Sequence, residues 1–182
     1  MACIGGISAS LAMPCGAPAR ADLNRPVSAK ILNAAAIASF TVGPGSVATI
    51  TRVPGKVGYD VTVDNKSLVV TVGLKSQDII PGAYDVAITF KSFSGVHTLV
   101  SEAAPGGVVD KLSRAELVIA VDHGDAIRVY GLGVPLVCTE MSGDSSASAY
   151  VTYTFGVEDW QVGTTIHYMN RKDYVALNSP AE

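Results

Sequence analysis

Three carboxylates near the middle of the chain come closest to an acid–base pair: Glu116, Asp122 and Asp125. A general acid and a general base must both reach the same substrate. Leu117 and its alternating apolar neighbours, however, form the apolar face of a predicted strand, which places Glu116 and Asp122 together on the opposite, exposed face. A solvated strand edge therefore accounts for these carboxylates better than a catalytic pair does.

The three histidines do not form a metal-binding pattern. His97, His123 and His167 fall on a predicted helix, turn and strand, with no second histidine four residues away and no carboxylate cluster between them. A protein-bound metal needs several convergent ligands. We therefore interpret the histidines as surface or interface residues, and we expect neither a metal nor a cofactor.

Two short segments resemble catalytic motifs only in part. Residues 6–10 match a nucleophile elbow in two letters but lack its second glycine and a preceding strand. Gly55 and Lys56 lack the upstream glycine and the following Ser or Thr of a phosphate-binding loop. A hydrolase requires a clustered nucleophile and base. The sequence offers no obvious candidates, so we expect no catalytic residue and no enzyme.

Aromatic residues are the remaining candidates for a binding site. Trp160 is the single tryptophan and follows Glu158 and Asp159, an arrangement suited to a ligand contact or a docking anchor, although one aromatic after a strand more often packs. The tyrosines do not form the stacking platform that binds single-stranded nucleic acid; those considered are Tyr150, Tyr153, Tyr168 and Tyr174.

The composition excludes some function classes. The 182 residues carry 13 Lys and Arg against 16 Asp and Glu, a net charge of -3 that offers no basic excess to grip phosphates. This balance is ordinary for a soluble protein and also suits a surface that DNA passes without sticking. Charged residues make up only 16%, against a typical 25% or so. Such a chain either hides surface against copies or partners, or is a plain Ala/Val/Gly-rich β domain.

No membrane insertion is expected, because no apolar run approaches the roughly 20 residues of a membrane span. Residues 1–21 resemble a secretory signal in being small and apolar, but no Lys or Arg precedes Arg20, and glycines and Pro14 interrupt the apolar run. We interpret this segment as mature protein. Cys3 and Cys15 could form a bridge that leaves Cys138 in an apolar strand, but reduced thiols throughout are favoured.

Alternation of apolar and polar residues dominates the chain and predicts half-buried strands. The clearest cases are a strand over residues 83–93, a hairpin over 116–132 and a closing strand over 149–157. Residues 57–63 and 68–74 predict a second hairpin around Asp64-Asn65-Lys66. One short helix is expected over Ser94–Ala104, while Asn33–Phe40 could be helix or strand. The sequence thus predicts one all-β domain over 1–182, an antiparallel sandwich or barrel with one short helix.

The predicted strand Leu68–Leu74 is apolar enough to need a partner strand. That partner is either in its own sheet or in a neighbouring subunit, and residues 65–80 could extend as an arm.

The layout resembles a known family. Its marks are an opening Met1-Ala2-Cys3 with a second cysteine at Cys15, small-residue loops and a fixed order of strands. The chain is similar in this order to the major tail tube proteins of tailed phages, particularly those infecting Bacteroidetes hosts. The matching segments are Val27–Asn33, Tyr84–Lys91, Leu117–Asp122, Asp122–Gly131, Ser142–Ala147 and Ala149–Phe155, so that the resemblance covers most of residues 1–158. The helix of the family is usually longer and more charged than Ser94–Ala104. Gln161–Glu182 extends past the end of many relatives. This tail is either an added strand over Thr164–Met169 or an interlocking segment.

The resemblance implies a virion structural protein, made in the host cytoplasm, with a tail-tube sandwich flanked by a helix. Six copies would form a ring, and rings would stack into a tube through which the genome leaves without specific binding. Expected partners are sister subunits and tape measure, baseplate or terminator proteins. We expect inter-subunit contacts from Met1–Ala21, Val57–Ile80 and Gln161–Glu182. The alternatives are a capsid decoration protein and a secreted adhesin or pilin-like β domain.

Overall fold

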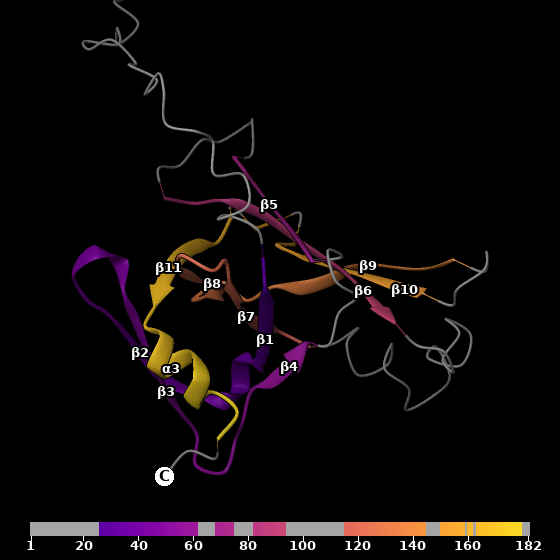
Figure 1. Cartoon of the computed structure of the whole chain (residues 1–182). Coiled ribbons are helices and arrows are strands. Elements are labelled where there is room, and N and C mark those ends of the chain that lie inside the picture. The colour runs from indigo at the N-terminus through magenta and orange to yellow at the C-terminus, as the bar shows by residue number, and fades with distance from the viewer. Residues whose placement is uncertain are drawn as a thin grey trace, which may run out of the picture.

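The structure is a computed structural model that describes residues 26–61, 68–74, 82–93, 115–144, 150–158, 160–161 and 163–179. The regular secondary structure of these residues is mostly β-strand (Figure 1). The strands are β1 (Ser28–Asn33), β2 (Ile37–Val42), β3 (Ala48–Arg52), β4 (Tyr59–Val61), β5 (Val69–Gly73), β6 (Asp85–Phe93), β7 (Leu117–Asp122), β8 (Ile127–Leu132), β9 (Val137–Asp144), β10 (Tyr150–Gly156) and β11 (Thr165–Met169). Short 3-10 turns span Ala34–Ala36 and Pro44–Ser46, and the α-helix α3 spans Arg171–Ala176.

The strands form three antiparallel sheets. A five-stranded sheet has the order β11-β8-β7-β1-β4, and a four-stranded sheet has the order β5-β6-β10-β9. The third sheet is the β2–β3 hairpin. The all-β, antiparallel class predicted from the alternation is confirmed.

Two hydrophobic cores lie on the two faces of the five-stranded sheet. One core joins it to the four-stranded sheet and contains Ile119, Tyr130, Ile88 and Phe155 among others. The other core lies beneath the β2–β3 hairpin and α3, and it includes Val129, Tyr174 and Leu177 among others. Figure 1 shows the hairpin and α3 on one side of the five-stranded sheet and the four-stranded sheet on the other. The central strand β7 is therefore buried on both faces.

Several predicted elements are confirmed. The strand at 83–93 corresponds to β6, and its Val86, Ile88 and Phe90 face the core as the alternation required. The hairpin at 116–132 corresponds to β7 and β8. The closing strand corresponds to β10, and the strand proposed at Thr164–Met169 corresponds to β11.

The predicted hairpin within Val57–Ile80 is wrong. Its first strand, β4, pairs with β1 at an edge of the five-stranded sheet, whereas its second strand, β5, pairs with β6 in the four-stranded sheet. Local turn chemistry suggested that the two strands pair with each other. Each instead extends a different sheet, so the chain crosses from one layer of the sandwich to the other between them.

The ambiguous stretch Asn33–Phe40 contains the end of β1, the 3-10 turn Ala34–Ala36 and the start of β2. The described α-helix is α3, which the sequence did not predict. The helix expected over Ser94–Ala104 and the segment Met1–Ala21 lie outside the described residues. Among the residues that are described, no helix combines the length and apolar character needed to cross a bilayer.

A bulge at Gly131 directs β8 into both cores. Gly131 has φ 87°, and the pairing of β8 with β11 shifts there. As a result Tyr130 packs in the core between the sheets while Leu132, two residues on, packs in the core beneath α3. A β-carbon at Gly131 would lie 2.6 Å from the carbonyl oxygen of Leu117. Only glycine fits this bulge without displacing backbone.

We therefore expect Gly131→Ala to lower the free energy of unfolding by about 2 kcal/mol more than Gly55→Ala does. Gly55 is a matched control because its φ of 76° is similar, but a β-carbon there would meet nothing within 4 Å. Urea denaturation of the two variants measures the difference. Equal losses would show that the backbone near Gly131 yields easily.

Candidate functional site

The carboxylates considered as an acid–base pair have different environments. Glu116 is exposed ahead of β7, and Asp125 is exposed in the turn after it. Asp122, at the end of β7, is buried, with 6% of its surface exposed. The prediction that Asp122 lies on a solvated strand edge is wrong, because the second face of β7 is covered by α3 and the hairpin rather than by water.

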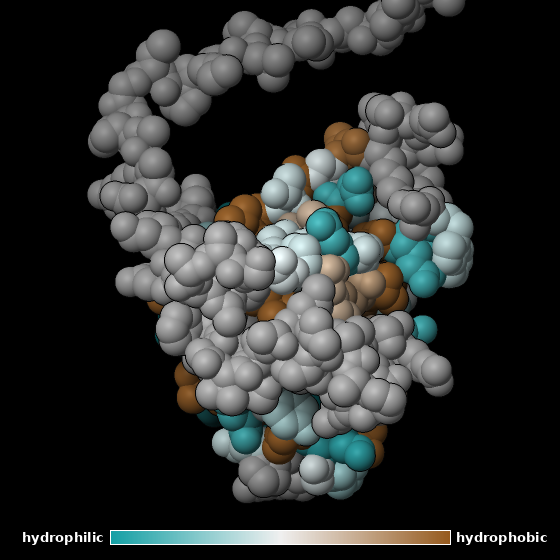
Figure 2. Space-filling view, turned by 90° about the vertical axis from the view of Figure 1, so that its right-hand side faces the viewer, coloured by the Kyte–Doolittle hydropathy of each residue, from teal (hydrophilic) through white to brown (hydrophobic). Residues whose placement is uncertain are grey.

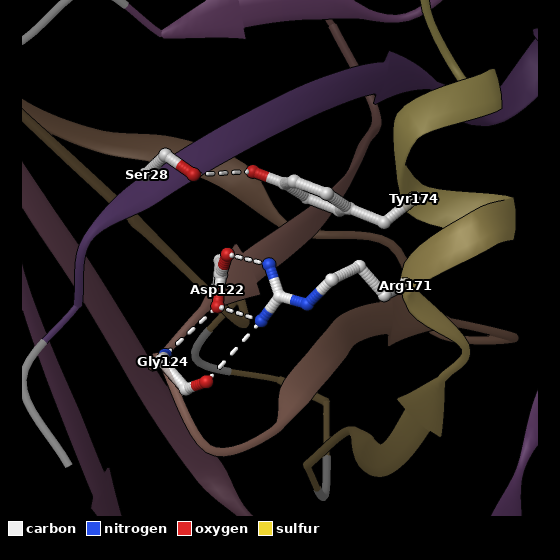
Figure 3. A network of polar contacts seen from close by, with 5 residues as sticks. All are labelled: Ser28, Asp122, Gly124, Arg171 and Tyr174. Carbon is white, nitrogen blue, oxygen red and sulfur yellow. Dashed lines mark hydrogen bonds and ion pairs between the residues drawn. The ribbon is translucent and has the colours of Figure 1, made fainter. Parts of the chain in front are cut away.

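Asp122 anchors a polar network beneath α3 (Figure 3). Arg171, the first residue of α3, donates from Nη1 to Oδ2 at 2.7 Å and from Nη2 to Oδ1 at 3.0 Å. The backbone N–H of Gly124 donates to Oδ1 at 2.8 Å, and Arg171 also donates to the Gly124 carbonyl at 3.2 Å. Both oxygens of the Asp122 carboxylate are thus occupied by charge-assisted or backbone bonds.

These contacts fix the ionisation of Asp122. The Arg171 guanidinium and the Gly124 N–H hold the pKa of Asp122 below its ordinary value of 3.8, against the smaller opposing effect of burial. The carboxylate is therefore ionised near neutral pH and has no proton to give. Its chemistry is that of a structural anchor for the C-terminal helix.

Further polar contacts join α3 and the residues after it to β1 and β4. The Tyr174 hydroxyl lies 2.9 Å from Ser28 Oγ, and the Lys30 ammonium lies 5.1 Å from the centre of the Tyr174 ring. Lys30 also pairs with Asp60 at 2.9 Å, and Asn178 donates to the other oxygen of Asp60. Burial raises the pKa of Tyr174, so its phenol stays neutral and hydrogen-bonded.

Arg52, at the end of β3, binds the C-terminal end of α3. Its Nη1 donates to the carbonyls of Leu177 at 2.9 Å, Ser179 at 2.6 Å and Lys56 at 3.1 Å, and its Nη2 donates to Ala176 at 3.1 Å. A helix leaves its last carbonyls without partners, and a cation there satisfies them and complements the helix dipole. Residues 163–179 thus pack on their own chain; inter-subunit contacts from Gln161–Glu182 stay a prediction.

We expect Arg52→Lys to loosen this end of the chain, because an ammonium cannot reproduce the planar fork that reaches several carbonyls at once. Hydrogen exchange of the Leu177 and Ser179 amides should accelerate by at least about tenfold, while amides of the buried strand β7 remain unchanged. Acceleration spread evenly over the whole protein would instead indicate general destabilisation.

Each of the two described histidines contacts a neighbouring side chain of the fold. The interpretation of the histidines as surface or interface residues is wrong for His123, which is buried in the turn after β7, with Nε2 3.2 Å from the Tyr130 hydroxyl. His167 on β11 contacts Thr165 Oγ1 at 2.8 Å through Nε2, and burial lowers its pKa. In the part of the chain that the structure describes, no three His, Cys, Asp or Glu residues are grouped as metal ligands would be. His97, Cys3, Cys15 and residues 6–10 lie outside the described residues.

The aromatic candidates are dispersed. Tyr153 packs against Phe90 in the core between the two sheets, with ring centres 5.5 Å apart, whereas Tyr174 lies in the other core. Tyr168 is exposed on β11, and Trp160 is 78% exposed in the loop after β10. These aromatic positions give no shared surface on which bases could stack.

Cys138 on β9 is half-buried, and burial raises the pKa of its thiol.

The most unusual surface feature is the edge strand β5. It pairs with β6 on one side, and no described strand pairs with its other side. Val69, Val72 and Leu74 are 52%, 43% and 51% exposed, and residues 69–74 carry no charge. Soluble proteins usually protect such an edge with charged residues, proline or a covering element. The edge of β9 away from β10 likewise has no described partner strand.

Figure 2 views the molecule from the side that lies to the right in Figure 1, where β6, β9 and β10 are drawn. Hydrophobic and hydrophilic residues alternate over its coloured surface. Val69 lies opposite Thr89 and Val72 opposite Val86, so the two exposed valines of β5 lie on opposite faces of the sheet along its edge. This arrangement suits strand pairing better than it suits docking of a broad apolar face.

No protein-family model, curated protein or solved structure matches this chain.

Proposed function

We propose that this protein is a structural subunit that assembles with copies of itself through the edges of its four-stranded sheet, and that it is the tail tube subunit of a tailed phage. The observation that carries the proposal is β5, an uncharged edge strand with half-exposed valines and a row of backbone groups to which no described strand pairs. Such an edge is a template for β-augmentation by another chain. The resemblance in strand order to tail tube proteins supplies the biological setting.

The topology of the four-stranded sheet is compatible with a closed ring. Each neighbouring pair in the order β5-β6-β10-β9 is antiparallel, so the two edge strands β5 and β9 run in opposite directions. When β9 of one copy meets β5 of the next, the new pair is therefore antiparallel too, and the sheet continues without a change of pattern. Such a head-to-tail contact is heterologous and generates a ring when the rotation closes.

The outer face of this sheet has the character that a channel wall needs. Thr89 and Thr154 face away from the core with their hydroxyls 3.1 Å apart, and Glu140 lies opposite Thr154 in the register. The four strands carry three acidic residues, Asp85, Glu140 and Asp144, and one basic residue, Lys91. Asp85 and Glu140 are exposed. Phosphates gain affinity from each Lys or Arg that neutralises them. A polar, mildly acidic wall would let DNA pass without holding it.

In this proposal the protein is located in the virion tail after synthesis in the host cytoplasm. Its partners are sister subunits in hexameric rings, the rings above and below, and the tape measure, baseplate or terminator proteins at the ends and in the lumen. DNA crosses the lumen without specific contacts, and no residue has a catalytic role.

Negative-stain electron microscopy of the purified protein, concentrated in low-salt and high-salt buffers, tests the proposal. We expect rings of sixfold symmetry or tubes built from them, with a matching mass by light scattering. Stable trimers would favour the decoration-protein alternative. Monomers at every concentration, or a processed N-terminus found by intact mass spectrometry, would favour the adhesin-like alternative.

A further inference from the structure

A groove lies between β2 and the turn that joins β8 to β9. It has a volume of about 350 Å³, which is at the lower end of the range of ligand sites. Its lining is uncharged and mostly apolar: Ala34, Ile37, Ala38, Ser39, Phe40, Val118, Gly131, Leu132, Gly133 and Pro135. A β-carbon at Gly133 would lie 3.8 Å from Phe40 Cζ, so the ring edge lies close above this glycine.

Phe40 is 40% exposed beside this groove, and Ala38 and Ser39 are exposed as well. From Ile31 to Thr51 the chain contains no charged residue. An occupant that brought a charge into the groove would therefore find no opposite charge on its walls and would lose hydration. An uncharged, extended peptide segment with aliphatic side chains suits this site.

The chain itself supplies a segment of this kind. Residues 1–19 contain no charged side chain and include Ile4, Leu11 and Met13. They precede the first described residue, Pro26, and 25 residues can span up to about 80 Å when extended. The segment is thus long enough to reach another molecule, and its apolar side chains gain free energy when they leave water.

We propose that residues 1–19 of one copy bind in the groove beside Phe40 of a neighbouring copy. This inference rests on the proposed self-assembly and names a second contact for it. The groove borders the start of β9, since Pro135 lines it and β9 begins at Val137, so it lies beside the edge that meets the next subunit. β1 begins at Ser28 and ends at Asn33, and Ala34, which lines the groove, follows directly after that far end. To reach the groove of its own chain, the segment 1–19 would therefore have to run back along the whole of β1.

Disulfide cross-linking between two versions of the full-length protein tests the inference. One version carries Ser39→Cys with Cys3, Cys15 and Cys138 replaced; the other keeps Cys3 and Cys15 and carries only Cys138→Ala. After mixing and mild oxidation, we expect a dimer of one chain of each kind, at a yield at least about tenfold above that of a control with Lys172→Cys on α3 in place of Ser39→Cys. Equal yields would overturn the inference.

A single chain with Ser39→Cys, Cys138→Ala and native Cys3 and Cys15 distinguishes the source of the segment. A disulfide formed only within one chain would contradict binding to a neighbour. Ala38→Glu should reduce the intermolecular yield by at least about tenfold, because it places a carboxylate in the groove, whereas Thr49→Glu on the exposed part of β3 should not. Rings without the cross-link would refute this contact alone, whereas absence of any assembly would refute the proposed function.

Discussion

Val72→Lys on β5 is expected to reduce self-assembly by at least about 100-fold while leaving the fold of the single chain intact. Val72 lies opposite Val86 and belongs to the core-facing side of the sheet, yet it is 43% exposed because no described strand lies beyond β5. In the assembled ring the neighbouring β9 would cover this side chain. A lysine ammonium would then have to be buried without a partner, which costs several kcal/mol. In the isolated chain the lysine can reach water through its long stem.

The matched control is Val42→Lys on β2, where the valine is 45% exposed and belongs to the separate β2–β3 sheet. Sedimentation velocity over a concentration series should show large assemblies for the wild type and the control, and single chains for Val72→Lys. Circular dichroism spectra and melting temperatures of the two variants should remain close to each other. Assembly of Val72→Lys at wild-type concentrations would exclude β5 as the contact.

Asp122→Ala is expected to lower the free energy of unfolding by about 3 kcal/mol, because it removes a buried acceptor of two Arg171 bonds and one backbone bond. The effect should be strongest at α3, whose six residues have little helical stability of their own. Denaturant unfolding gives the total loss. Hydrogen exchange should show that amides of 171–177 lose protection before those of β7 do.

The same ion pair predicts a pH dependence. The folded-state pKa of Asp122 lies below its ordinary value of 3.8, so the contribution of the pair is fully present above that value. It is lost as the pH falls through the folded-state pKa, because the carboxylate then takes up a proton in both states. The difference in unfolding free energy between wild type and Asp122→Asn should therefore shrink in acid. A difference that stays constant below pH 3.8 would contradict this assignment.

Alternation along the chain was sufficient to predict β6, β10 and the β7–β8 hairpin, because each has an apolar face that must meet a core. It also identified Leu68–Leu74 as a strand in need of a partner, and part of that need is met within the chain by β6. Pairing between strands was harder to predict. The sequence Asp64-Asn65-Lys66 favours a hairpin locally, but β4 and β5 extend two different sheets.

The polar network could not be predicted from local pattern. Asp122 follows five apolar residues, so nothing nearby in the sequence shows that a helix 49 residues later covers it. The spacing of Tyr174 and Leu177 after Asn170 is a weak helix signal that could have suggested α3. The role of Arg52 depends on carbonyls more than 120 residues away and has no sequence signature. The surroundings of Asp122, α3 and Arg52 all depend on how segments that are distant in the sequence pack against one another.

Amide hydrogen exchange on β5 tests the self-pairing of sheet edges most directly. In the assembled protein, the amides of residues 69–73 that point away from β6 should exchange at least about tenfold more slowly than in the non-assembling Val72→Lys chain. Those bonded to β6 should differ far less. If outward-pointing amides of β5 exchange equally fast in assembled and single chains, the sheets do not join there and another surface holds the copies together.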